Sequence, residues 1–139
     1  MISLKDEKIV LVEDDPDHAE LIIDVLKTEN VKKEIVLLTD GLKALNYLQE
    51  MDIENNGELR SQINLVILDL NLPKVNGMEI LKFIKENLRF CSIPVVILST
   101  SSDHKTIATA YENGADSYIT KPISYEDFVE KIKALSVYC

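Results

Sequence analysis

The sequence predicts an α/β fold, a doubly wound three-layer sandwich with a five-stranded parallel sheet and five helices. Short apolar runs rich in valine and isoleucine recur five times along the chain, and segments with helical spacing separate them. Continuous apolar runs are typical of strands that are covered on both faces. Right-handed crossovers then place the intervening helices on both sides of the sheet.

The expected strands are the five apolar runs, at residues 8–13, 34–38, 64–69, 94–99 and 116–120. Three of the predicted helices have a clear apolar face: Ala19, Ile22, Ile23 and Leu26; Ile80, Leu81, Ile84 and Leu88; and Tyr125, Phe128, Val129, Ile132 and Leu135. The remaining two are a short helix at 42–50 and a polar one at 104–114, which stops at Asn113 and Gly114. We expect the polar stretch 51–63 to form a surface loop.

The composition excludes several classes of function. The chain has 139 residues, of which 46% are hydrophobic and 28% charged, as in a single globular domain over 1–139. A formal net charge of −9 argues against nucleic-acid binding, and no segment resembles a membrane span or a signal peptide. Cys91 and Cys139 match no metal or redox spacing, so we expect a packing residue and an exposed last residue. These features predict a cytoplasmic protein.

Polar side chains gather where four of the predicted strands end. Because parallel strands end at the same edge of a sheet, these side chains are expected to share one cleft. Clustered carboxylates repel unless a cation neutralises them, and a hard divalent ion such as Mg²⁺ prefers oxygen ligands. The strand ends carry Glu13, Asp14 and Asp15; Asp69; Ser99 and Thr100; and Thr120, Lys121 and Pro122.

Each strand end, taken alone, has a simpler interpretation. The acidic run 13–15 is typical of a loop, with Asp15 as a helix N-cap before Pro16 at the first helical position. Lys121 alone is most often a solvated lysine. The joint placement of these groups on four strand ends favours a site.

Four segments together resemble the CheY-like receiver domain of response regulators in two-component signalling. They are KIVLVEDDPD, LVILDLNLPKVNGMEIL, PVVILSTSSD and GADSYITKPIS, within a resemblance that covers about residues 7–136. The chain is most similar to the small single-domain receivers associated with bacterial phytochromes. The resemblance implies the strand order 2-1-3-4-5 and no output domain.

The resemblance also implies the chemistry. Asp69 would accept a phosphoryl group from a sensor histidine kinase, including the phytochrome type, or from a histidine phosphotransfer protein. Mg²⁺ (or Mn²⁺) would be held by Asp14, Asp69 and the backbone carbonyl of Asn71, with Glu13 acting through bound water.

The remaining roles come from the same resemblance. Lys121 would pair with Asp69 and then with the phosphoryl group, aimed by a cis bond to Pro122. Ser99, with Thr100 as the alternative, would donate its hydroxyl to the phosphoryl group, and Tyr118 would turn inward as a switch.

Three side chains near the predicted site are expected to set the lifetime of the phosphorylated state. The resemblance implies that Asn71 and Ser101 would control water access, and Thr100 is bulky enough to narrow the entrance. Neither Asn71 nor Ser101 is a strong base, so we expect moderate hydrolysis.

Output is expected through contacts with a downstream protein that the sequence does not specify. The apolar tail 134–139 fits either a homodimer contact or a packed helix end. We expect no enzymatic activity beyond self-phosphotransfer and autodephosphorylation.

Three alternatives to this function stay open. The first is a degenerate receiver that binds partners without phosphorylation. A haloacid dehalogenase phosphatase is disfavoured, because Asn71 stands where that family has a second aspartate. A flavodoxin-like cofactor-binding module is disfavoured too, because the loop after the first strand is acidic and no glycine-rich phosphate loop is present.

Overall fold

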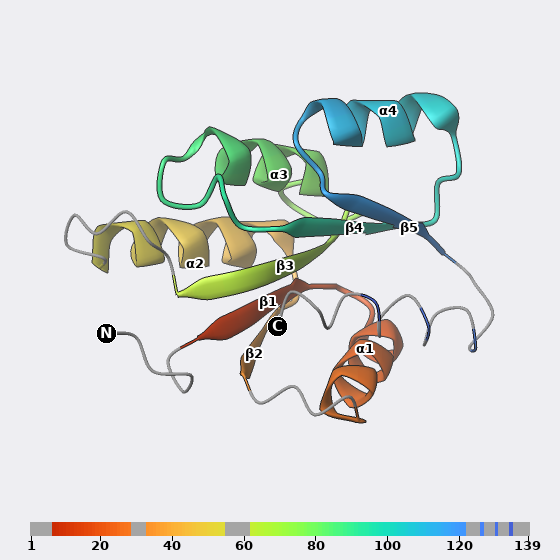
Figure 1. Ribbon diagram of the computed structural model, residues 1–139, viewed down its shortest axis with the longest axis horizontal. Helices are drawn as coiled ribbons and strands as arrows, with labels where there is room; N and C mark the ends of the chain where they lie inside the picture. Colours follow the sequence, from red (N-terminus) through yellow and green to blue (C-terminus); the bar gives the residue numbers. More distant parts are fainter. Residues whose placement is uncertain are drawn as a thin grey trace.

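A parallel five-stranded sheet in the order β2-β1-β3-β4-β5 organises the chain (Figure 1). The computed structural model describes residues 7–28, 33–54 and 62–121, together with 126, 130 and 134. The fold class and strand order predicted from the sequence are confirmed. The elements are β1 (Lys8–Val12), α1 (Pro16–Thr28), β2 (Glu34–Leu38), α2 (Gly41–Glu54), β3 (Ile63–Asp69), α3 (Gly77–Glu86), β4 (Val95–Ser99), α4 (His104–Glu112) and β5 (Ser117–Thr120).

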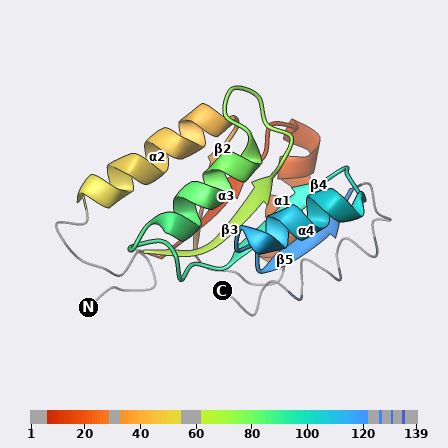
Figure 2. The ribbon, with the colours of Figure 1, turned by 90° about the horizontal axis from the view of Figure 1, so that it is seen from above.

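Helices cover both faces of the sheet, as the views of Figures 1 and 2 show. Helices α2, α3 and α4 lie on one face and α1 lies on the other. Alternate residues of the central strands enter the two cores: Val66 and Leu68 of β3 pack on the first face, and Leu65 and Ile67 on the second. Burial on both faces explains why the central strands are continuous apolar runs.

The predicted start of α1 and end of α4 are confirmed. Asp15 caps α1, because its Oδ1 accepts the backbone N–H groups of Asp17 at 2.9 Å and His18 at 3.3 Å. Gly114 follows α4 with φ of 101°, a conformation that glycine adopts at little cost.

Helix α2 is longer than predicted. It continues through Glu54, four residues into the stretch 51–63 that was expected to be a loop. Met51 explains the extension, because it follows Ala44 and Leu48 on the buried face and is itself only 9% exposed. One apolar residue at helical spacing therefore outweighs the polar residues around it.

The prediction for the end of α3 is wrong. Leu88 was placed on the buried face, but the helix ends at Glu86 and Leu88 is 83% exposed. The Asn87 N–H bonds back to the Ile84 carbonyl, and the chain then turns. The buried position is taken by Phe90 instead.

Cys91 lies in the same turn and is exposed, so its predicted packing role is also wrong. The turn that carries Leu88 outward leaves the Cys91 thiol at the surface, 3.7 Å from the Leu88 carbonyl oxygen.

The predicted fifth helix and the tail 134–139 lie outside the described residues except for Glu126, Glu130 and Ala134, and so do Cys139 and the Lys121–Pro122 bond. None of the helices in the described part of the chain is long and apolar enough to cross a membrane.

Candidate phosphoacceptor and metal site

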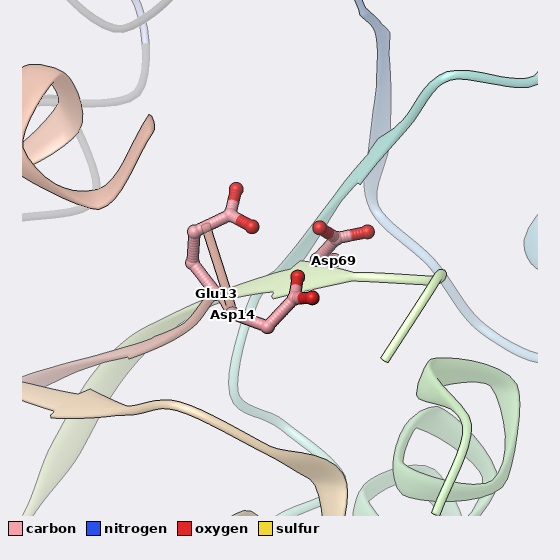
Figure 3. A group of neighbouring side chains, drawn as sticks. All are labelled: Glu13, Asp14 and Asp69. Atoms are coloured by element: carbon pink, nitrogen blue, oxygen red, sulfur yellow. The ribbon is translucent and has the colours of Figure 1, made fainter. Parts of the chain in front are cut away.

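Three carboxylates meet at the carboxyl edge of the sheet (Figure 3). Glu13 and Asp14 follow β1, and Asp69 ends β3. One oxygen of each lies within 4.8 Å of an oxygen of the other two. Glu13 and Asp69 are buried, at 1% and 5% exposure, whereas Asp14 is exposed. The cluster therefore has a buried base and one side that is open to solvent.

Strand register brings the other predicted side chains to the same edge. Asp69 lies beside Leu98 of β4, and Ser99 lies beside Thr120 of β5. The next residue after β5 is Lys121, whose backbone N–H bonds the Ser99 carbonyl at 2.6 Å.

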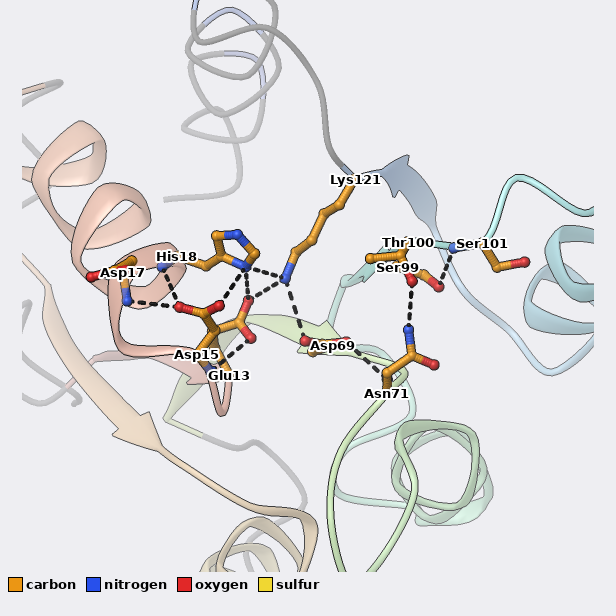
Figure 4. Close-up of polar contacts among 10 residues, drawn as sticks. All are labelled: Glu13, Asp15, Asp17, His18, Asp69, Asn71, Ser99, Thr100, Ser101 and Lys121. Carbon is orange, nitrogen blue, oxygen red and sulfur yellow. Dashed lines mark hydrogen bonds and ion pairs between the residues drawn. The ribbon is translucent and has the colours of Figure 1, made fainter.

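The Lys121 ammonium lies against two of these carboxylates (Figure 4). It donates to Oε1 of Glu13 and, at 3.3 Å, to Oδ2 of Asp69. The predicted pairing with Asp69 is present, but Glu13 is the closer partner. One ammonium beside three carboxylates leaves this cluster with surplus negative charge.

Burial raises the pKa of the Glu13 carboxyl to about 7, because the charged form loses its water shell. The neighbouring Asp69 carboxyl contributes to the same rise, and the Lys121 ammonium opposes it. Glu13 thus holds a proton more readily than an ordinary glutamate when no other cation is near.

The backbone around Asp69 fixes its carboxylate. Oδ1 of Asp69 accepts the Asn71 N–H at 2.8 Å, and the Leu70 N–H bonds the Leu98 carbonyl at 3.0 Å. Gly77, the first residue of α3, packs directly on this strand end, since a Cβ there would lie 2.3 Å from the Asp69 carbonyl oxygen. The predicted role of the Asn71 carbonyl as a metal ligand stays a prediction.

Ser99 and Thr100 point in different directions, as strand alternation predicts. Ser99 is buried at 1% exposure, and its Oγ accepts the Ser101 N–H at 3.1 Å. Thr100 is exposed, and its Oγ1 accepts a hydrogen bond from the Asn71 side chain at 3.1 Å (Figure 4). The side chains of Asn71 and Thr100 thus join the loops after β3 and β4.

Tyr118 on β5 is half-buried, and its hydroxyl donates to the Ser101 carbonyl at 2.8 Å. Ser101 therefore contacts Ser99 through its N–H and Tyr118 through its carbonyl.

His18 was missed in the sequence. Its Nδ1 lies 3.2 Å from the Lys121 ammonium, beside Glu13 (Figure 4). The one available clue was its place in the first turn of α1, three residues after the cap Asp15, on the helix that starts at the site.

The family described as the response regulator receiver domain matches residues 9–133 of the chain. The protein belongs to the receiver domain family. Response regulator Rcp1 of Synechocystis sp. is 36% identical over 130 residues, which cover 94% of this chain and 86% of Rcp1. The receiver is also similar to solved structures of response regulators.

The Mn²⁺-bound form of Rcp1 has a TM-score of 0.79 and 37% identity, with 93% of this chain and 91% of that chain covered. The phosphorylated cyanobacterial phytochrome response regulator RcpA has a TM-score of 0.80 and 36% identity, with 95% and 92% covered. The receiver is thus similar to phytochrome-associated response regulators, in the family of phosphoacceptor domains of two-component signalling.

The donor set of the receiver fits a hard divalent cation. Three carboxylates offer only oxygen atoms, they lie close enough to share one ion, and exposed Asp14 leaves an approach from solvent. A divalent ion would also balance the surplus negative charge of the edge.

Proposed function

We propose that the receiver accepts a phosphoryl group on Asp69 from a histidine kinase or a histidine phosphotransfer protein. The carrying observation is the position of the Asp69 carboxylate: it is buried beside Glu13 and Asp14, with one oxygen held by the Asn71 N–H and the other by Lys121. The names of RcpA and its relatives support a phytochrome-type kinase as the donor.

In the proposed transfer, an Asp69 oxygen attacks phosphorus, the O–P bond forms, and the P–N bond to the donor histidine breaks. A carboxylate is a weak nucleophile, so the protein contributes position and charge balance. The Asn71 N–H orients the carboxylate, and the Lys121 ammonium turns to a phosphoryl oxygen. Mg²⁺ or Mn²⁺, held by Glu13, Asp14 and Asp69, would supply further positive charge when bound.

The proposed response starts at Ser99. Its hydroxyl releases the Ser101 N–H and donates to the phosphoryl group. The released Ser101 also carries the carbonyl that anchors Tyr118. One residue therefore connects the hydroxyl at the site with the aromatic ring on β5, and the altered face would contact a downstream protein.

The test is incubation with acetyl phosphate and Mg²⁺, followed by intact-mass analysis. We expect one phosphoryl adduct, lost without Mg²⁺ and lost in Asp69→Asn. Asp24→Asn is the matched control, because it removes an exposed carboxylate of α1 and should leave the adduct unchanged. A wild-type chain without an adduct would support the degenerate receiver instead.

A further inference from the structure

We infer that His18 is a positioning residue for Lys121, holding the ammonium while the partner of that lysine changes from Asp69 to the phosphoryl group. The inference rests on the proposed function, and it adds a residue from α1 to the site. Its basis is the hydrogen-bond geometry around Nζ of Lys121.

An ammonium has three N–H groups, and the structure gives Lys121 three acceptors. They are Oε1 of Glu13, Oδ2 of Asp69 at 3.3 Å and Nδ1 of His18 at 3.2 Å. The lysine is 7% exposed, so few water molecules can take the place of a lost acceptor. Each of the three contacts therefore contributes to the position of Nζ.

The distances from Nδ1 of His18 to its neighbours indicate that the imidazole accepts a hydrogen bond from Lys121. Nδ1 of His18 lies 3.2 Å from the ammonium but 3.7 Å from Oδ2 of Asp15 and 3.9 Å from Oε1 of Glu13. Only the first distance is suited to a direct hydrogen bond. Two protonated nitrogens would repel at that separation, so Nδ1 accepts and the ring carries its proton on Nε2.

Helix α1 fixes the position of His18. The Asp15 carboxylate that caps the helix accepts the His18 N–H at 3.3 Å, and the ring then projects toward Lys121 (Figure 4). The contact joins the first turn of α1 to the end of β5, two parts of the chain that are 103 positions apart.

A neutral acceptor suits this place better than a third carboxylate. Glu13 and Asp69 attract the ammonium by charge, and they compete with a phosphoryl oxygen for it. His18 orients one N–H without adding negative charge, so the other two stay available. When Asp69 is phosphorylated, the lysine can turn to the new oxygen while its third hydrogen bond is kept.

The test compares His18→Leu with His18→Asn. The two side chains have the same shape, but only asparagine has an acceptor, Oδ1, where the histidine has Nδ1. We expect the rate of phosphorylation by acetyl phosphate to fall about tenfold in His18→Leu, as for loss of a charged hydrogen bond, and to recover to within about threefold of wild type in His18→Asn. Equal rates in wild type and His18→Leu, or an asparagine variant as slow as the leucine variant, would overturn the inference.

A second readout needs neither metal nor phosphate. Heteronuclear NMR of the metal-free protein should show a slowly exchanging Lys121 ammonium in wild type and His18→Asn, and fast exchange in His18→Leu. The His18 ring should show its proton on Nε2; a proton on Nδ1 would overturn the inference. Failure of the proposed function gives a different result, since the wild type then takes no adduct while these NMR signals persist.

Discussion

Two lysines at opposite edges of the sheet each donate hydrogen bonds to three acceptors, but the two sets of contacts have different roles. Lys121 lies at the carboxyl edge, and Lys85, near the end of α3, lies at the amino edge. Lys85 donates to the carbonyls of Cys91 at 3.3 Å and Ile93 at 2.7 Å, and to Oδ2 of Asp116 at 3.1 Å. Each ammonium thus has three acceptors.

The difference lies in the charge of those acceptors. At the amino edge one carboxylate balances one ammonium, and Oδ2 of Asp116 also accepts the Val95 N–H at 2.8 Å. At the carboxyl edge Lys121 pairs with two carboxylates, Glu13 and Asp69, and the Asp14 carboxylate lies beside both of them. The balanced contacts of Lys85 hold strands and loops together at the amino edge. The surplus negative charge around Lys121 favours the binding of a further cation at the carboxyl edge.

The largest expected effect is that of Lys121→Met. Methionine keeps the length of the side chain but removes the charge that would neutralise a phosphoryl oxygen. The rate of Asp69 phosphorylation by acetyl phosphate should fall on the order of 10²- to 10³-fold, measured by intact mass over time. A rate within about twofold of wild type would contradict the assigned role of the carboxyl edge.

Lys85→Met should give the opposite pattern. Loss of the ammonium leaves the Ile93 carbonyl and the Asp116 carboxylate without their cation, so the free energy of unfolding in urea should fall by about 2–3 kcal/mol. The folded variant should still be phosphorylated by acetyl phosphate at the rate of the wild type. Lys82→Met is the control, because Lys82 is exposed on the same helix; equal losses in both variants would remove the contrast between the two edges.

The carboxyl edge should also make the stability of the metal-free protein depend on pH. The pKa of Glu13 is about 7 in the folded chain and about 4.5 when unfolded, so folding binds a proton between these values. The contribution of Glu13 to the free energy of unfolding is therefore fully present below about pH 4.5 and is lost as the pH rises through about 7. In EDTA, Tm should fall by several degrees between about pH 5 and pH 8.

Glu13→Gln is the control for the fall of Tm with pH, since glutamine has the shape of glutamate but no carboxyl group that can titrate. A fall in Tm of the same size in this variant would assign the pH dependence to another group.

The smallest effects are expected at the entrance to the site. Asn71→Ala and Ser101→Ala should change the dephosphorylation rate about two- to fivefold, because neither side chain is a base strong enough to activate water. Thr100→Val distinguishes the effect of side-chain size from that of hydrogen bonding, because valine keeps the size of threonine and removes the acceptor of the Asn71 hydrogen bond. Unchanged rates in both alanine variants would refute their tuning role.

Much of this arrangement could be predicted from the sequence because local features determine it. Strands buried on both faces must be apolar runs, and parallel strands must end together, which places Glu13, Asp69 and Ser99 at one edge. The cap Asp15 before Pro16 is equally local.

The errors share one physical cause, which is that side-chain direction depends on contacts between distant elements. Leu88 continues the spacing of α3, but the helix ends before it. Met51 looked like part of a loop until its packing against the core was known. The contact of His18 with Lys121 needs two elements far apart in sequence, and no spacing rule connects them.

Gly77 limits how this receiver can vary. Its α-carbon lies against the backbone of Asp69, where a side chain of any kind would push the proposed phosphoacceptor out of place. Asn71 and Thr100, both exposed, have room for substitution. In a library of all substitutions selected for signalling, position 77 should therefore stay glycine, while positions 71 and 100 should accept several residue types.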